Sequence, residues 1–317
     1  MPSPGQASLR RRILVIKLGA LGDFVHAFHA FAAIRRRHAG DHVALLTTAP
    51  FQALAKAAPW FDEVLVDPRA PWWNLPAINR AVRAVRGADF IYDLQTSSRS
   101  GLYFNLAGRP PWSGIAPGCS HPHANPGRDA MHTLERQREQ LQDAGITEWH
   151  PPEREWLVKS GHGHAIATPY ALLAPGGAGV GAAKRWPPAR YAEAARSLRD
   201  SGLAPVVIGG RAETALGREI SAACPGALDL TARTTIPDIA ALAARAAVVL
   251  GNDTGPVHLA ASVGAPTVVL FSAAGAPEQA APRGPNGEWA TVLHVPDLRS
   301  LQVEAVMAAV RQAVGAG

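Results

Sequence analysis

One stretch, residues 248–271, restricts the fold of this chain more than any other. It reads VVLGNDTGPVHLAASVGAPTVVLF, in which two apolar runs enclose a turn and an alanine-rich segment of helical spacing. This pattern predicts a strand, a turn, a helix and a strand. The free N–H groups and positive dipole end of such a helix suit a phosphate above the sheet edge. Asp253 and Thr254 are the predicted caps, Gly255 permits close backbone approach, and Pro256 has no N–H to lose in the first turn.

Strand and helix patterns alternate along the rest of the chain, which predicts parallel sheets. Residues 110–128 are rich in Pro, Gly and His and indicate a long loop, and residues 149–168 indicate a linker. The first series has expected strands at 12–18, 43–47, 64–66 and 90–94, and expected helices at 24–37, 50–58, 74–86 and 133–144. The second has expected strands at 170–174, 204–208, 248–250 and 267–271, and expected helices at 187–201, 213–223, 236–245 and 300–314.

The two series predict an α/β chain of two Rossmann-like, doubly wound domains that face a central cleft. We expect the N-terminal domain to comprise residues 1–160 and the C-terminal domain residues 161–317. Ligands of open parallel sheets bind at the carboxyl ends of the strands. The loops of both domains are therefore expected to point into the cleft.

Composition limits the function classes. The chain has 317 residues, 47% of them hydrophobic, and no apolar run approaches the roughly 18 to 20 residues that span a bilayer. Because the N-terminus lacks the apolar centre of a secretion signal and the two cysteines lie far apart, we expect a cytoplasmic protein without a zinc site. The net charge of +6 suggests an acidic partner. Nucleic acid is disfavoured, since the basic residues are dispersed and no recognition motif occurs.

Two loops of the first domain carry candidate chemistry. The first, residues 17–23, ends in Asp23, and His26 lies three residues further on the same predicted helix face. Asp23 is either a helix cap or a carboxylate that accepts a proton from a hydroxyl nucleophile. The second loop, residues 93–99, combines short polar side chains with Arg99. It either holds a sugar or phosphate or is simply a capped loop.

Two loops of the second domain suit a nucleotide. Residues 174–181 contain four glycines, and Lys184 and Arg185 follow. Backbone N–H groups of such a loop can approach a diphosphate that the two cations neutralise. In residues 209–213, Glu213 either binds a ribose diol or begins its helix. No Gly-x-Gly-x-x-Gly motif precedes an acid at the usual distance, which argues against a nicotinamide-dependent oxidoreductase.

An ordered set of motifs resembles glycosyltransferase family 9, the ADP-heptose:lipopolysaccharide heptosyltransferases. The motifs are KLGALGDFVH at 17–26, DLQ at 93–95, Pro175-Gly176, KRWP at 184–187 and, most specific, GNDTGPVHLAA at 251–261. The resemblance implies a GT-B fold with the acceptor on the N-terminal domain and the nucleotide sugar on the C-terminal one. It also implies a last helix, at about 300–315, that packs back on the N-terminal domain, and transfer with inversion, without a metal or cofactor.

Carried over by motif position, Asp23 resembles the general base, and Lys17 a residue that faces acceptor phosphate. A lysine and a helix N-terminus would stabilise the departing ADP. His258 would support that helix. We expect Lys17, Gln95 and Arg99 to bind the acceptor. The donor is expected to contact Gly176, Gly177, Lys184, Arg185, Gly210, Glu213, Asp253, Thr254, Gly255, Pro256 and His258.

The resulting hypothesis is an inverting glycosyltransferase that moves heptose or a related sugar from an ADP-sugar. The acceptor would be a lipopolysaccharide core or another lipid-linked or phosphorylated surface glycan. Arg10 to Arg12, Arg35 to Arg37 and Trp72-Trp73 suggest peripheral contact with the anionic cytoplasmic face of the inner membrane. The alternatives are a non-catalytic protein that binds nucleotide sugars or glycans on the same fold, and a transferase that uses a different nucleotide sugar.

Overall fold

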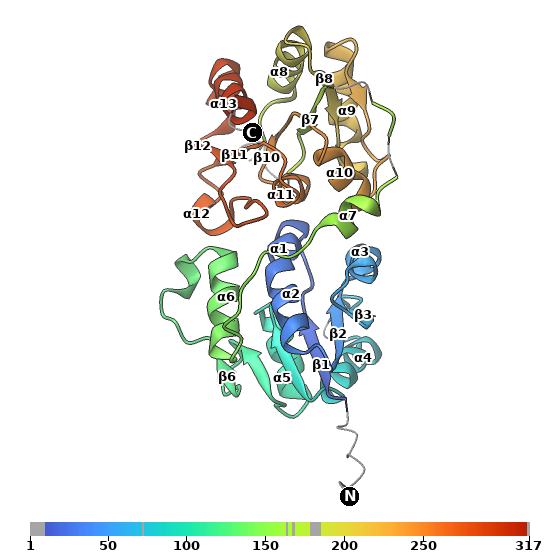
Figure 1. The fold of residues 1–317 in the computed structure, drawn as a ribbon, viewed down its shortest axis with the longest axis vertical. Coiled ribbons are helices and arrows are strands. Elements are labelled where there is room, and N and C mark those ends of the chain that lie inside the picture. Colours follow the sequence, from blue (N-terminus) through green and yellow to red (C-terminus); the bar gives the residue numbers. More distant parts are fainter. Residues whose placement is uncertain (1–9, 72, 163, 167–168, 178–184, 316–317) are drawn as a thin grey trace, which may run out of the picture. The chain divides into compact units, whose positions relative to one another are not determined.

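The computed structural model describes residues 10–71, 73–162, 164–166, 169–177 and 185–315. The chain divides into two compact units (Figure 1). Two short segments from the N-terminal half belong to the second unit rather than the first. Within the described ranges, the first unit contains residues 10–19, Ala27–Arg128 and Leu134–His150, and the second contains Ala20–His26, Asp129–Thr133 and the residues from Pro151 onward.

The first unit is built on a parallel sheet of six strands in the order β3-β2-β1-β4-β5-β6. The central strand β1 is almost wholly buried, and its Ile13 pairs with Val43 on one side and Phe90 on the other. Continuous apolar runs are typical of parallel strands that helices cover on both faces. The strands are β1 Arg12–Ile16, β2 His42–Thr47, β3 Glu63–Val66, β4 Phe90–Asp93, β5 Trp112–Gly114 and β6 His121–Pro122.

The helices of this half of the chain depart from expectation at two places. The helix expected at 24–37 is broken at Ala27, because α1 (Leu21–His26) packs in the second unit and α2 (Phe28–Arg37) in the first. The expected loop at 110–128 was wrong, since it contains β5 and β6. The remaining helices are α3 Gln52–Ala57 after the short 3-10 turn Ala49–Phe51, α4 Leu75–Arg86, α5 Ser98–Leu106, which was not predicted, and α6 Thr133–Asp143.

The second unit repeats the architecture with the strand order β12-β11-β10-β7-β8-β9, all parallel. Leu250 of β10 pairs with Leu173 of β7 and Val268 of β11, so the centre of the sheet is entirely apolar. The strands are β7 Tyr170–Ala174, β8 Ala204–Val207, β9 Leu228–Asp229, β10 Val248–Asn252, β11 Thr267–Ser272 and β12 Thr291–Val295. The short edge strands β9 and β12 were not predicted.

The helices of the second unit largely follow the predicted spacing. The expected linker at 149–168 contains α7 (Glu155–Lys159), a single turn and a half with one buried leucine. The last helix, α13 (Val303–Gly315), packs against α8 and the strands β10 to β12. The others are α8 Pro188–Asp200, α9 Thr214–Ala223 after the 3-10 turn Arg211–Glu213, α10 Ile236–Ala243, α11 Gly255–Ser262 and α12 Pro277–Ala280. In the described part of the chain, no helix has the length and apolarity needed to cross a bilayer.

Each sheet has one switch point, where the chain leaves one half of the sheet and returns to the other. It lies between β1 and β4 in the first unit and between β7 and β10 in the second. Loops that leave neighbouring strands at such a point diverge, which opens a crevice at the carboxyl edge. The two-sheet α/β fold predicted from the sequence is confirmed.

The side chain of Asn252 holds the switch point of the second unit together. Its Nδ2 donates to the carbonyls of Pro175 and Gly176, at 2.9 and 3.0 Å. Its Oδ1 accepts from the backbone N–H of Trp186, at 3.2 Å, and from the hydroxyl of Tyr191, at 3.0 Å. One fully buried amide therefore ties the end of β10 to the loop after β7 and to the start of α8.

We predict that Asn252→Ala lowers the free energy of unfolding by about 2–4 kcal/mol, because it leaves the Tyr191 hydroxyl and two backbone carbonyls buried without partners. Urea denaturation measures the change. Asn79→Ala, on the exposed face of α4, is the matched control and should change the free energy by less than about 0.5 kcal/mol. A loss of under about 1 kcal/mol for Asn252→Ala would show that the amide does not organise this edge.

Candidate functional site

A cavity of about 270 Å³ opens at the carboxyl ends of β7, β8 and β10. Three loops line it, one from each strand, and glycines dominate two of them. Such a cavity, at the switch point and with backbone amides on its walls, is where doubly wound sheets hold nucleotides. Its lining residues are Ala174, Gly176, Gly177, Ile208, Gly209, Gly210, Glu213, Thr254 and Pro256.

Glu213 lies between the two glycine loops of this cavity. Its carboxylate accepts a hydrogen bond from the N–H of Gly210, at 2.9 Å. A Cβ atom added at Gly176 would come within 2.8 Å of the Glu213 side chain, and one added at Gly209 within 2.7 Å. The glycines are therefore required by the close approach of this carboxylate, which both begins its helix and faces the cavity.

Arg185 borders the same loop. Its Nη2 donates to the carbonyl of Gly177, at 3.1 Å, which fixes the guanidinium beside the glycine loop. Lys184, which the sequence predicts beside the diphosphate, lies outside the described residues, as does 178–183. Of the two cations predicted to bind the donor diphosphate, Arg185 is the one within the described part of the chain.

The helix α11 begins at the mouth of the cavity. Thr254 occupies the N-cap position with extended backbone angles, but its side chain makes no capping hydrogen bond in the described structure. Asp253 does not cap the helix either, since its Oδ1 lies 3.1 Å from Nε2 of His258. The backbone N–H groups of the first turn of a helix have no preceding turn to accept them. The sequence thus places Thr254 correctly at the helix start, while the expected side-chain caps were wrong.

His258 continues the contact to α1. Its Nδ1 lies 3.1 Å from Nε2 of His26, and the two rings meet edge to face at 4.9 Å. Since an ionised carboxylate can only accept, the tautomer of His258 that donates from Nε2 to Asp253 has Nδ1 as an acceptor for His26. His26 in turn meets the ring of His132 at 5.0 Å, and Nε2 of His132 lies 3.0 Å from the carbonyl of Ala281. Four segments of the second unit therefore meet at three buried imidazoles.

Close glycine contacts seat α1 directly on α11. A Cβ at Gly255 would lie 2.6 Å from the Leu21 Cβ, and a Cβ at Gly22 would lie 2.9 Å from the His258 ring. Asp23 follows in the first turn of α1, half-exposed, and its Oδ2 accepts from the N–H of Ala20, at 3.2 Å. The carboxylate of Asp23 thus belongs to a helix that rests on the start of α11.

The residues predicted to bind the acceptor lie in the first unit, at the carboxyl ends of β1 and β4. Lys17 is only 4% exposed, and its Nζ donates to the carbonyl of Leu94, at 3.0 Å. Oε1 of Gln95 accepts from the N–H of Leu18, at 2.7 Å, and the amide nitrogen of Gln95 takes no part in that bond. Both side chains therefore join the loops after β1 and β4.

Arg99 is held by a buried acid that the sequence did not single out. Its Nε and Nη2 bind the two oxygens of Asp67, each at 2.9 Å, and its Nη1 donates to the carbonyl of Ala70. The hydroxyl of Tyr103 donates to the same carboxylate, at 2.7 Å. Burial raises the pKa of Asp67, but the hydrogen bonds from Arg99 and Tyr103 outweigh it and lower the pKa. Arg99 thus fixes the loop after β3 to the start of α5.

Asp93, which ends β4, is wholly buried. Burial raises its pKa to about 6, although backbone N–H groups of Thr96 and Gln95 donate to its Oδ1 and oppose that rise. Thr96 adopts a left-handed backbone with φ of 44°, and its hydroxyl accepts from Arg128, at 2.9 Å. The loop at 94–97 is therefore shaped around one carboxyl group.

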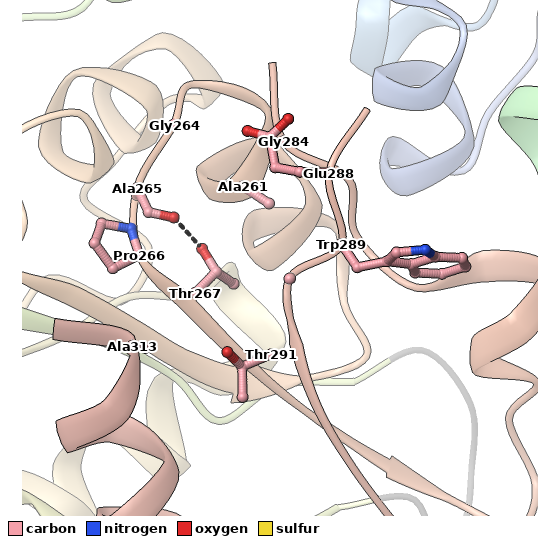
Figure 2. A pocket seen from close by; sticks show the side chains of 11 residues that line it. Ala261, Gly264, Ala265, Pro266, Thr267, Gly284, Glu288, Trp289, Thr291 and Ala313 are labelled. Atoms are coloured by element: carbon pink, nitrogen blue, oxygen red, sulfur yellow. Dashed lines mark hydrogen bonds between the residues drawn. The ribbon is translucent and has the colours of Figure 1, made fainter. Parts of the chain in front are cut away.

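A second cavity, of about 310 Å³, lies at the amino ends of β11 and β12, the edge of the sheet opposite to the first (Figure 2). Its polar side chains serve the local backbone. The hydroxyl of Thr267 donates to the carbonyl of Ala265, and the carboxylate of Glu288 accepts from the N–H of Asn286. This cavity therefore differs from the first, which gathers loops at the carboxyl edge.

The structure brings together most of the residues predicted for the donor, all within the second unit. Gly176, Gly177, Gly210, Glu213, Thr254 and Pro256 line one cavity, and Arg185, Asp253, Gly255 and His258 border it or the start of α11. Asn252 and His132 were missed. Asn252 lies inside the motif at 251–261, which could have pointed to it, whereas His132 stands in a segment with no motif of its own.

Comparison with known proteins gives a consistent result. The family model of glycosyltransferase family 9 (heptosyltransferase) matches residues 77–307. The lipooligosaccharide heptosyltransferase 2 of Haemophilus influenzae is 35% identical over 100 residues, which are 30% of this chain and 29% of that protein. The matching segment therefore spans less than a third of that curated relative.

Solved structures match over nearly the whole chain. The glycosyl transferase family 9 structure from Veillonella parvula is 20% identical, with a TM-score of 0.80 over 97% of this chain and 98% of that one. The E. coli heptosyltransferase WaaC with ADP is 18% identical, with a TM-score of 0.73 over 95% and 99%. At these identities the likeness shows the fold.

The raised pKa of Asp93 predicts a stability that falls as the pH rises. The pKa of about 6 exceeds the unfolded value, so the folded chain binds the proton more tightly and the contribution is complete below about pH 4. It is lost as the pH rises through about 6. Asp93→Asn, which cannot ionise, should therefore gain stability relative to the wild type between about pH 4.5 and about pH 7, as measured by urea denaturation. A difference that is the same at both pH values would contradict the buried ionisation.

Proposed function

Because the chain belongs to glycosyltransferase family 9, we propose that it transfers heptose or a related sugar from an ADP-sugar to a lipopolysaccharide core or another surface glycan. Family membership rests on the match over residues 77–307. The prediction of this family from the sequence is thereby confirmed. The GT-B fold that the family implies is also confirmed by the similarity to solved structures.

We propose that the nucleotide sugar binds in the cavity at the carboxyl ends of β7, β8 and β10. The glycine loops admit the diphosphate close to backbone N–H groups, and the carboxylate of Glu213 is suited to the ribose diol. Arg185 and the start of α11 supply positive potential for the diphosphate, with Lys184 in the same segment. The WaaC structure contains ADP, which supports an adenine nucleotide as the donor's leaving group.

The proposed chemistry is a single displacement. The acceptor hydroxyl attacks the anomeric carbon from the face opposite to the diphosphate, so the configuration inverts. Its proton passes to the carboxylate of Asp23, and ADP departs with the electron pair of the broken C–O bond. Arg185 and the N–H groups at the start of α11 would stabilise the charge that develops on the leaving diphosphate.

The observation that carries this proposal is the packing of α1 on α11. The close contacts of Leu21 with Gly255 and of Gly22 with His258 set the carboxylate of Asp23 on a helix that rests against the donor loop. A general base must lie within hydrogen-bond reach of the acceptor hydroxyl that attacks the anomeric carbon. A carboxylate on a loop distant from the donor would not meet this requirement.

We propose that the acceptor binds the N-terminal residues 1–160, at the loops after β1 and β4. The amide nitrogen of Gln95 would donate a hydrogen bond to it. A lipid-linked or phosphorylated glycan would then be presented to Asp23. We propose the C-terminal residues 161–317 as the donor domain, and the cytoplasmic face of the inner membrane as the place of action. Lys17 would contribute to acceptor binding by holding the loops after β1 and β4 together, because its ammonium donates to the carbonyl of Leu94.

We predict that Asp23→Ala reduces kcat by about 10²- to 10⁴-fold, while the affinity for ADP changes by less than about twofold. The assay is ADP release from ADP-heptose with a heptose-deficient lipopolysaccharide, and calorimetry gives the affinity. Asp143→Ala, an exposed acid at the end of α6, is the control and should leave both unchanged.

Unchanged turnover in Asp23→Ala would refute the assigned base. A wild-type chain that binds ADP-heptose but never consumes it would instead favour the nucleotide-sugar-binding alternative. Binding restricted to a UDP- or GDP-sugar would refute the proposed nucleotide.

A further inference from the structure

Residues 73–115 of the first unit contain most of the exposed large apolar side chains. Of the eight in the described part of the chain, five lie between residues 73 and 115. Trp73 is 67% exposed and Leu75 is 64% exposed. An exposed apolar set of this size on one layer indicates an interaction surface. We call it the α4–α5 face, and define it as the exposed side chains of residues 69–86 and 98–115, whose large apolar members are Trp73, Leu75, Leu102, Leu106 and Ile115.

The charge on this face is of one sign. Residues 68–119 contain six arginines and two aspartates. Asp93 is buried, and Asp89 accepts the backbone N–H of Arg12, at 2.7 Å. The α4 and α5 segments contain no acid at all. The exposed arginines are Arg69, Arg80, Arg83, Arg86 and Arg109.

The two helices turn their outer surfaces to the same side. Ile78 and Val82 of α4 and Phe104 of α5 enter one core cluster beneath them. The outward arc of α4 carries the arginines at positions 80, 83 and 86, with the exposed leucine at its start. Arg86 reaches across to α5, where its Nη2 donates to the carbonyl of Leu106, at 2.7 Å. Arginines and apolar side chains are therefore interleaved on one continuous surface.

We propose that the α4–α5 face docks the protein on an anionic lipid bilayer. Guanidinium groups would bind the anionic headgroups, and the tryptophan and leucines would enter the boundary with the acyl chains. Tryptophan favours this boundary because its ring is apolar and its N–H is polar. A nucleic acid would use the arginines but would give the four aliphatic side chains no apolar phase to enter, so the lipid surface is the better partner.

The arginines that the sequence suggests for membrane contact are arranged differently. Arg10 and Arg35 both bind Asp62, at 3.2 and 2.9 Å, and Arg12 binds Glu63, at 2.9 Å. Three of those six cations are thus committed to ion pairs. Trp72 lies outside the described residues, while Trp73 belongs to the α4–α5 face. The three arginines of α4, by contrast, stand in a helix without an acid.

The apolar end of the face adjoins the proposed acceptor loops. Trp73 follows the carboxyl end of β3, and α5 begins directly after the loop that contains Gln95. Arg99 joins the two segments through its hydrogen bond to the carbonyl of Ala70. A docked face would thus hold the acceptor loops near the headgroups. This last step rests on the proposed function, whereas the docking itself does not.

The test is sedimentation of the full chain with vesicles of equal parts phosphatidylglycerol and phosphatidylcholine, compared with pure phosphatidylcholine. We expect binding to the anionic vesicles only, weakened by salt, and about tenfold weaker or more in Arg80→Glu/Arg83→Glu. Trp73→Ser/Leu75→Ser should weaken it as well. The control is Arg218→Glu/Arg311→Glu, which reverses two exposed arginines of the second unit and should bind like the wild type. Circular dichroism confirms that each variant is folded.

Equal binding by the α4 variant and the control would overturn the proposal, as would a lack of binding to anionic vesicles by the wild type. Binding of a DNA duplex instead of vesicles would assign the face to nucleic acid. Concentration-dependent dimers that Trp73→Ser/Leu75→Ser dissociates, without vesicle binding, would assign it to a second copy.

Transfer to a deacylated, water-soluble acceptor separates the docking proposal from the proposed function. The α4 variant should retain this transfer. A wild-type chain that does not carry it out would refute the proposed function but leave the docking result standing.

Discussion

The geometry of the donor site depends on the buried amide of Asn252. Four hydrogen bonds from this one side chain join β10 to the loop after β7 and to the start of α8. A buried amide is stable only when all its groups are paired, so the loop carbonyls and the helix start are confined to one arrangement. The glycine loops, the carboxylate of Glu213 and the start of α11 can then surround a single cavity.

A second constraint sets a piece of the N-terminal sequence against this site. Gly22 and Gly255 permit α1 and α11 to approach more closely than any side chain would allow. The imidazoles of His26 and His258 complete the contact with a hydrogen bond, and Asp253 orients the second ring. The proposed base therefore comes from the first strand-to-helix turn of the chain but belongs to the unit that would hold the donor. This contact brings together two of the family motifs, at 17–26 and 251–261, that lie more than 200 residues apart in the sequence.

The sequence predicted the parts that local patterns determine. Apolar runs such as Ile13 to Ile16 and Val248 to Leu250, which end at glycine-containing turns, predict buried parallel strands, and the order of motifs identified the family. The features that the sequence did not predict depend on tertiary contacts, which no local pattern contains. The helix through Ala27 is interrupted because its two halves pack in different units, and β9 has only two residues and no apolar run. The pairing of Arg99 with Asp67 and the imidazole of His132 also depend on residues distant in sequence.

The central claim, that the carboxyl edge of β7, β8 and β10 holds the nucleotide sugar, is tested most directly by amide hydrogen exchange with and without ADP. Ligand binding slows exchange where backbone N–H groups are covered or the loops are ordered. We predict slower exchange with ADP in the peptides that contain residues 174–177, 208–213 and 253–258, and unchanged exchange in α4 and α5. Protection confined to other segments, with these three loops unaffected, would contradict the account.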